Sequence, residues 1–332
     1  MKTITPLPVL LQSFFMDRLI AQRQASPHTL AAYRDTFRLL FHFAQDRLRK
    51  TPSDLALEDL DAPFIGAFLD HLERTRGNSP QSRNLRLAAI RSFFRYVSFQ
   101  EPGQSNHIQR VLAIPSKRHD QPLIDFLTRP EIEALLSAPD PKTREGRRDH
   151  ALLLLALQTG LRLSEIIGLR LADVTLGQGA HVRCQGKGRK ERCTPLTRHT
   201  RVVLQAWMNE RGGSPTDVVF PNRQGGAFSP DGVQYLVHKH VQIAQRICPS
   251  LKQKRISPHV LRHTAAMELL QAGVDCSMIA LILGHASMKT TQIYLHANLS
   301  LKEDILAKTT PIPGKFGRFK PTDKLLDFLQ AL

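Results

Sequence analysis

The sequence predicts a mainly α-helical protein with one small β-sheet, built as two domains. Three observations predict this architecture. Apolar residues recur at helical spacing from residue 9 to residue 99. A polar stretch with two prolines, residues 104–126, then has the character of a linker. Beyond it, residues 180–196 carry the pattern of a β-hairpin among further helical segments.

Length and charge bound the class of protein. A chain of 332 residues is too long for one typical small domain and suits two. It carries 46 Lys and Arg against 29 Asp and Glu, a formal net charge of +17, with a pI of about 10.2. This excess of positive charge favours a polyanionic partner, most often nucleic acid, over a basic protein with no special partner.

Neither a membrane segment nor a disulfide framework is predicted. The most apolar run, residues 151–157, is far shorter than a bilayer span. Pro6 and Pro8 interrupt the apolar start that a signal peptide would need. The scattered cysteines, which form no C-x-x-C pair, are Cys184, Cys193, Cys248 and Cys276. We expect a cytoplasmic protein with no membrane partner and no zinc ribbon.

The N-terminal helices have clear start signals. Ser26-Pro27 and Ser79-Pro80 each place a capping hydroxyl before a proline that suits the first helical position. We expect a bundle of four helices, each of about 15 to 20 residues.

The last helix of this bundle, residues 82–99, is unusually basic. It has no Asp or Glu, and its arginines are Arg83, Arg86, Arg91 and Arg95. A solvated surface face explains such a pattern, and so does a surface that contacts DNA phosphates. The composition of the helix leaves both interpretations open.

The second domain begins with Thr128, which forms a capping-box pattern with Glu131. A buried helix over residues 147–159 ends at Gly160, a helix-ending glycine. Further helices are expected over residues 198–210, 230–247 and 258–271.

A Gly-Lys-Gly turn divides the predicted hairpin into two short strands. Against the single acid Glu191 the hairpin carries Arg183, Lys187, Arg189, Lys190 and Arg192. Most such hairpin tips are simply solvated, so the turn alone is a weak signal.

Residues of two distant segments have the chemistry of phosphoryl transfer. Arg162 and Arg262 can grip the non-bridging oxygens of a phosphate, where charge grows in the transition state. His259 lies one helical turn before Arg262 and shares its face. Tyr294 is a candidate nucleophile, although a free tyrosine, with a pKa of about 10, needs its proton removed. Lys187 could protonate a leaving alkoxide.

Simpler interpretations compete with this one. A single helical tyrosine is more often a core or surface residue than a nucleophile. His259 and His263 have the spacing of two metal ligands on a helix. No glutamate of an H-E-x-x-H motif accompanies them, however, and Arg262 would place a cation beside the metal.

Four ordered motifs change this balance. TGLRLSE, QGKGRKER, SPHVLRHTAA and LGHASMKTTQIY together resemble the tyrosine recombinase (phage integrase) family, closest to its bacterial Xer-type and mobile-element members. The resemblance covers residues 128–298. More loosely, SPHTLAAYRDTFRLLFHF and RLAAIRSFFRYV resemble the family's SAM-like, core-type DNA-binding domain.

The resemblance implies a role for each matching residue. It makes Arg162 and Arg262 the phosphate-binding arginines and Glu165 the acid that supports the site. It makes Lys187 the hairpin lysine that protonates the leaving 5′ oxygen, with Lys190 as its one rival. The remaining matches are His259, which helps accept the tyrosine proton, His285, a hydrogen-bond donor to the phosphate, and Tyr294, the nucleophile that forms a 3′-phosphotyrosyl bond.

The implied enzyme is a site-specific recombinase or integrase that exchanges strands between two DNA duplexes and needs no metal or nucleotide cofactor. It would act as a homotetramer on double-stranded DNA, with Arg189 and Lys190 among its DNA contacts. The expected parts are a DNA-binding domain (1–105), a linker (106–126), an α+β catalytic domain (127–310) and a tail (311–332) whose short helix docks on a neighbouring subunit. Two other functions compete: a type IB topoisomerase, and a DNA-binding relative without catalysis.

Overall fold

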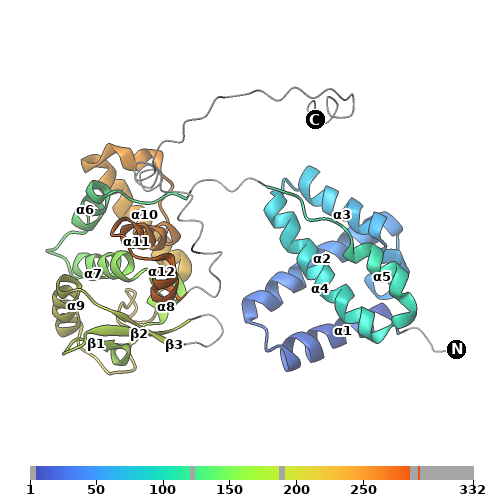
Figure 1. Cartoon of the computed structure of the whole chain (residues 1–332), viewed down its shortest axis with the longest axis horizontal. Coiled ribbons are helices and arrows are strands. Elements are labelled where there is room, and N and C mark those ends of the chain that lie inside the picture. The colour runs from blue at the N-terminus through green and yellow to red at the C-terminus, as the bar shows by residue number, and fades with distance from the viewer. Residues whose placement is uncertain (1–4, 120–123, 187–190, 285–290, 292–332) are drawn as a thin grey trace, which may run out of the picture. The chain divides into compact units, whose positions relative to one another are not determined.

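A computed structural model describes residues 5–119, 124–186, 191–284 and 291 of this chain (Figure 1). It divides into two compact units, Met1–Gln121 and Pro122–Leu332. Helices dominate both units, and the described residues contain one small antiparallel sheet. The predicted fold class is therefore confirmed.

The N-terminal unit is a helical bundle. Its helices are α1 (Leu7–Ser13), which continues as a π-helical stretch (Phe14–Gln22), α2 (Pro27–Leu48), α3 (Ala62–Arg74), α4 (Pro80–Gln100) and α5 (Ser105–Leu112). Both predicted Ser-Pro starts are confirmed, since the Oγ atoms of Ser26 and Ser79 accept from backbone N–H groups in the first turns of α2 and α4. Helix α4 packs against α2, α3 and α5 and buries Phe93 and Phe94 completely.

Helix α5 differs from the sequence prediction, which assigned its residues to the linker. Ile108 and Val111 on α5 are fully buried against the bundle, so this segment completes the N-terminal core. With only eight residues and two strongly buried apolar side chains, α5 carries too short a periodic pattern to be distinguished from a polar connection.

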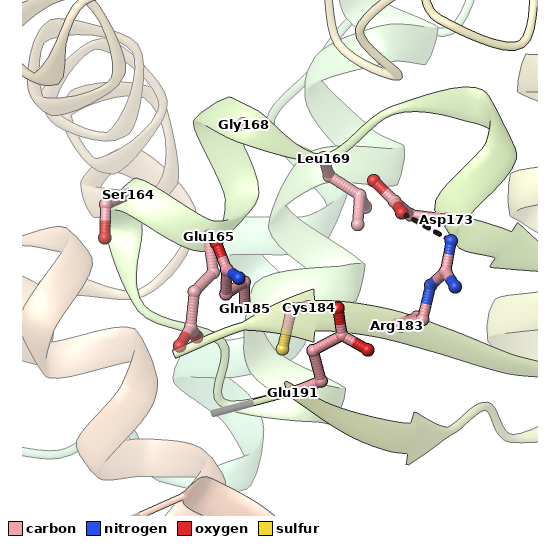
Figure 2. A pocket seen from close by; sticks show the side chains of 9 residues that line it. All are labelled: Ser164, Glu165, Gly168, Leu169, Asp173, Arg183, Cys184, Gln185 and Glu191. Atoms are coloured by element: carbon pink, nitrogen blue, oxygen red, sulfur yellow. Dashed lines mark hydrogen bonds and ion pairs between the residues drawn. The ribbon is translucent and has the colours of Figure 1, made fainter. Parts of the chain in front are cut away.

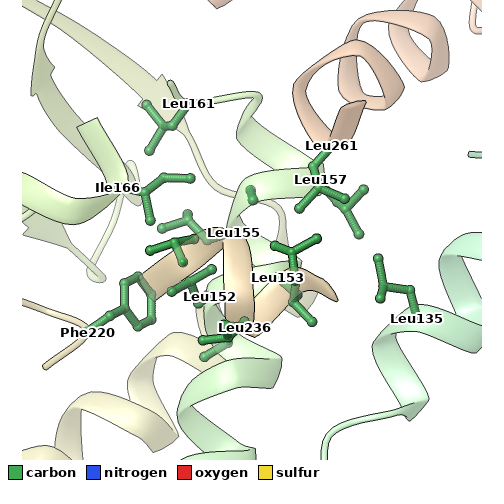
Figure 3. Packing of buried hydrophobic residues seen from close by; sticks show 14 of the residues in the cluster. Leu135, Leu152, Leu153, Leu155, Leu157, Leu161, Ile166, Phe220, Leu236 and Leu261 are labelled. Atoms are coloured by element: carbon green, nitrogen blue, oxygen red, sulfur yellow. The ribbon is translucent and has the colours of Figure 1, made fainter. Parts of the chain in front are cut away.

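The C-terminal unit surrounds one apolar helix, α7 (Arg144–Thr159). Leu152, Leu153 and Leu155 of α7 lie in the middle of the core, next to Leu261 and Leu236 from other helices (Figure 3). Among the described residues of this unit, the other α-helices are α6 (Arg129–Ser137), α8 (Leu163–Gly168), α9 (Arg198–Arg211), α10 (Pro230–Ile247), α11 (Pro258–Gln271) and α12 (Cys276–Leu283).

The predicted hairpin is confirmed as strands β2 (His181–Gln185) and β3 (Glu191–Pro195), which pair antiparallel with Cys184 opposite Arg192. Strand β1 (Val174–Thr175), which the sequence analysis did not anticipate, extends the sheet beside β2. The helices expected from the later Ser-Pro signals are confirmed as α10 and α11.

Gly160 is the point where α7, α11 and α12 meet. It ends α7 in the left-handed region with φ of 59°. A Cβ there would overlap Leu283 Cδ2 and lie 3.2 Å from Ala265 Cβ. Glycine is thus required twice, once for the backbone conformation and once for the close approach.

Gly160→Ala should lower the free energy of unfolding of this unit more than Gly273→Ala. Gly273 also has a positive φ but open space around its missing Cβ, so its substitution should cost about 1 kcal/mol of strain alone. Crowding should add about 1–3 kcal/mol for Gly160→Ala. Urea unfolding followed by Trp207, the chain's single tryptophan and a core residue of this unit, measures both. Equal losses would contradict the close packing.

Candidate active site

Arg162 enters the site from the N-terminal end of α8, directly after the turn that follows Gly160. Its backbone N–H donates to Glu165 Oε2 at 2.7 Å and its Nη1 donates to Glu165 Oε1 at 3.0 Å. Its Nη2 donates to the Gly284 carbonyl at 2.6 Å. The side chain remains 28% exposed, so a ligand can reach it.

Arg262 comes from α11 and is nearly buried, with 4% of its surface exposed. Its Nη1 donates to the Gly160 carbonyl at 2.6 Å, and its Nη2 donates to the Leu283 carbonyl at 2.7 Å. Arg162 and Arg262 therefore bind consecutive carbonyls at the C-terminal end of α12. These carbonyls lack partners within the helix and carry its partial negative charge, which attracts cations.

His259 lies one turn before Arg262 on the same helix, as predicted. Its ring packs edge-on against His263, with ring centroids 4.6 Å apart. Burial, followed by the charges of Arg262 and Arg162, lowers the pKa of His259 below its ordinary value of 6.5. The imidazole is therefore mainly neutral at pH 7 and has a lone pair that can accept a proton.

Glu165 is held by two arginines. Arg192 on β3 donates from Nη1 and Nη2 to its two carboxylate oxygens, each at 2.8 Å. Burial raises the pKa of Glu165, but the bonds from Arg192 and Arg162 outweigh it, so the net pKa is lowered and the group is ionised. In the sequence, Arg192 is only one of several basic hairpin residues. Its strand position gave no sign of a carboxylate partner on α8.

A pocket of about 340 Å³ lies beside this cluster, between α8 and the hairpin (Figure 2). Three carboxylates line it, those of Glu165, Asp173 and Glu191. Arg183 lines it as well and pairs with Asp173 at 3.5 Å, so the pocket has mixed charge and no excess of cations that would attract a phosphate.

Several predicted site residues lie outside the described residues. They are Lys187, Arg189 and Lys190 of the hairpin turn, and His285 and Tyr294 beyond α12. The structure brings Arg162, Glu165, His259 and Arg262 together in one cluster, although they belong to segments far apart in the sequence.

Two of the α4 arginines hold the chain that leaves the N-terminal bundle. Arg83 is only 5% exposed, and its Nη1 donates to the Pro115 carbonyl at 3.2 Å. Arg91 donates to the Ile114 carbonyl and to Ser116 Oγ. This geometry gives both residues an intramolecular role, and their contact with DNA phosphates stays a prediction.

The other two α4 arginines are more accessible. Arg86 is partly buried and donates to the Ala32 carbonyl at 3.0 Å and to Thr36 Oγ1 at 3.1 Å. Arg95 is exposed, and among the described residues its guanidinium has no hydrogen-bond partner. Arg95 is therefore the α4 arginine best placed to meet a phosphate.

Within residues 5–119, 124–186, 191–284 and 291, no group of three or more His, Cys, Asp or Glu side chains could hold a metal ion. Across the same residues, no helix is both long and apolar enough to cross a membrane.

Comparison with known proteins identifies the family of this chain. The profile of the phage integrase family matches residues 125–300, and that of the phage integrase N-terminal SAM-like domain matches residues 13–100. The y4rC protein of Sinorhizobium fredii, named as an integrase/recombinase, is 59% identical over 326 residues, 98% of each chain. The tyrosine recombinase XerC of Pelobacter propionicus is 34% identical over 298 residues, 90% of this chain and 94% of that protein.

A solved structure has the same fold. The XerH site-specific recombinase in a post-cleavage complex with a palindromic difH substrate superposes with a TM-score of 0.70 at 23% identity, over 86% of this chain and 81% of that one. The chain belongs to the phage integrase family, the tyrosine recombinases that cut and rejoin DNA.

The pKa of His259 should lie below 6.5 when measured by NMR titration, with its signal assigned by loss in His259→Gln. Arg162→Gln should raise it, because one of the cations that disfavour protonation is removed. Arg95→Gln, in the other compact unit, is the matched control and should leave it unchanged. A His259 pKa above 6.5 in the unmodified chain would contradict a neutral proton acceptor at pH 7.

Proposed function

We propose that this chain is a site-specific recombinase or integrase that breaks DNA through a 3′-phosphotyrosyl bond to Tyr294 and exchanges strands between two duplexes. The observation that carries the proposal is the pair of guanidiniums on consecutive carbonyls at the end of α12. Two fixed cations on one short stretch of backbone suit the two non-bridging oxygens of a single phosphodiester.

Each cluster residue then has a step in the reaction. Arg162 and Arg262 bind the phosphate and stabilise the charge that grows on its oxygens. The neutral imidazole of His259 helps take the proton of Tyr294, whose oxygen bonds to phosphorus while the bond to the 5′ oxygen breaks. Lys187 protonates that oxygen, and His285 donates a hydrogen bond to the phosphate. Attack by a 5′ hydroxyl on the phosphotyrosine reverses these steps and frees the tyrosine.

The energy of the broken phosphodiester bond is kept in the phosphotyrosyl bond between protein and DNA, so rejoining needs no nucleotide cofactor. The chain acts as a homotetramer on two duplexes in the cytoplasm, where its DNA substrate lies, and the apolar run in residues 324–332 docks on a neighbouring subunit. Family membership and the +17 charge support a DNA partner.

Outside the catalytic cluster, the exposure of each arginine side chain indicates how directly it contacts DNA. Exposed Arg95 contacts DNA phosphates directly, whereas partly buried Arg86 is held by its bonds to the Ala32 carbonyl and Thr36 Oγ1 and contributes less. The intramolecular bonds of Arg83 and Arg91 make their contribution to DNA binding partly indirect, through the course of residues 114–117. Arg189 and Lys190 supply contacts from the hairpin turn.

Tyr294→Phe should abolish covalent capture of a nicked suicide duplex carrying the recombination site, while duplex binding persists. The reason is that the phenyl ring keeps the shape of the side chain but has no oxygen to bond to phosphorus. Tyr235→Phe is the matched control. Tyr235 is 71% exposed on α10, so the Tyr235→Phe variant should form the covalent complex normally. Denaturing gels measure the complex, and covalent capture by Tyr294→Phe would refute the assignment.

The same substrates separate the competing functions. Relaxation of supercoiled DNA without exchange between duplexes would favour a type IB topoisomerase. Duplex binding with no cleavage by the unmodified chain, unaffected by Tyr294→Phe, would favour a non-catalytic DNA-binding protein.

Binding to the duplex should weaken steeply with salt, because many phosphate contacts release counterions. Arg95→Gln should reduce the slope of log K against log salt by about 1, the amount expected for one lost phosphate contact. Arg83→Gln, which removes a buried guanidinium, should change the slope less. Fluorescence anisotropy over a salt series measures both. A slope unchanged in Arg95→Gln would remove Arg95 from the DNA interface.

A further inference from the structure

Arg192 is a largely buried cation that the proposed reaction does not yet use. Its side chain is 13% exposed, and that of its partner Glu165 is 3% exposed. We propose that Arg192 is a positioning residue that neutralises Glu165, so that Arg162 keeps its positive charge available for the scissile phosphate. This inference rests on the proposed function, because it concerns the same phosphate.

The hydrogen bonds show how the charge is divided. Both oxygens of Glu165 are taken by the two Nη atoms of Arg192 at 2.8 Å, the paired geometry that suits a guanidinium and a carboxylate. Arg162 adds one side-chain bond, from Nη1 to Oε1 at 3.0 Å. Two guanidiniums thus share one carboxylate, and the group keeps one net positive charge.

Removing Arg192 would change that balance. Arg162 and Glu165 would then form a neutral pair, and the carboxylate would compete with the phosphate for the Arg162 guanidinium. The competition would be strong, because Glu165 is buried and its charge is poorly screened by water. The role of Arg192 is therefore electrostatic, and it acts through Glu165 and Arg162 rather than by touching the substrate.

The backbone around Arg192 is shaped to admit its guanidinium. A Cβ on Gly284 would lie 2.7 Å from Arg192 Nη1 and 3.0 Å from its Cδ. A Cβ on Gly186 would lie 3.3 Å from the same Nη1. Arg192 therefore packs directly on Gly284, the residue whose carbonyl binds Arg162 Nη2. The side chain that neutralises Glu165 also supports the carbonyl that orients Arg162.

A purely structural alternative is that Arg192 only ties the hairpin to α8. The two roles respond differently to removal of the carboxylate charge. If Arg192 acts by charge, Glu165→Gln should repair the loss caused by Arg192→Gln, because no unbalanced carboxylate remains. If Arg192 only ties the two elements together, the double variant has lost both halves of the tie and should be no better.

The test measures single-turnover covalent capture of the nicked suicide duplex by full-length variants. Arg192→Gln should slow capture by about tenfold or more, the loss expected when one charged contact of a phosphate-binding arginine is diverted. The double variant E165Q/R192Q should capture the duplex faster than Arg192→Gln and to within about threefold of E165Q alone. Thermal melting of each variant checks that it is folded.

Arg192→Lys keeps the test decisive if Arg192→Gln fails to fold. Lysine retains the charge but loses the paired geometry, so capture should stay within about threefold of the unmodified chain. A loss of more than about threefold in a folded Arg192→Lys variant would overturn the electrostatic role, because the charge would then be present without restoring capture.

The outcomes separate the two proposals. Absence of a phosphotyrosyl complex with the unmodified chain would overturn the proposed function and this inference together. Normal capture by folded Arg192→Gln, or a double variant no better than Arg192→Gln, would overturn only the role of Arg192.

Discussion

The site depends on one interaction, the binding of two guanidiniums to backbone carbonyls at the C-terminal end of α12. A helix end leaves carbonyls without intrahelical partners, and here Leu283 and Gly284 give theirs to Arg262 and Arg162. The two guanidiniums are thereby fixed before any substrate arrives. This matters for phosphoryl transfer, because cations that need no reorganisation stabilise the growing charge most effectively.

The packing of the core places the C-terminal end of α12 next to the end of α7. The apolar helix α7 occupies the middle of the C-terminal unit and ends at Gly160, whose missing side chain lets Leu283 of α12 approach. The carbonyl of the same glycine accepts the second bond of Arg262. One backbone position thus couples the packing of three helices to the placement of the Arg262 guanidinium, and Glu165 extends the network to the hairpin through Arg192.

Local signals in the sequence predicted most of the fold, and ordered motifs predicted the cluster. The Ser-Pro helix starts, Gly160 and the hairpin are short-range features, so their chemistry is visible in the sequence. Helix α5 was missed because its stability comes from burial of Ile108 and Val111 rather than from its own pattern. The partners of Arg192 and Arg83 could not be predicted, because a carboxylate on α8 and a carbonyl at Pro115 reach them only through tertiary packing.

The central claim is that Arg162 and Arg262, held at the end of α12, bind one scissile phosphate. The most direct measurement is an experimental structure of the chain trapped on a cleaved duplex. Both guanidiniums should donate to oxygens of the same phosphate at hydrogen-bond distances of about 2.7–2.9 Å, with that phosphorus bonded to Tyr294. A phosphate bound away from either arginine, or joined to another side chain, would contradict the claim.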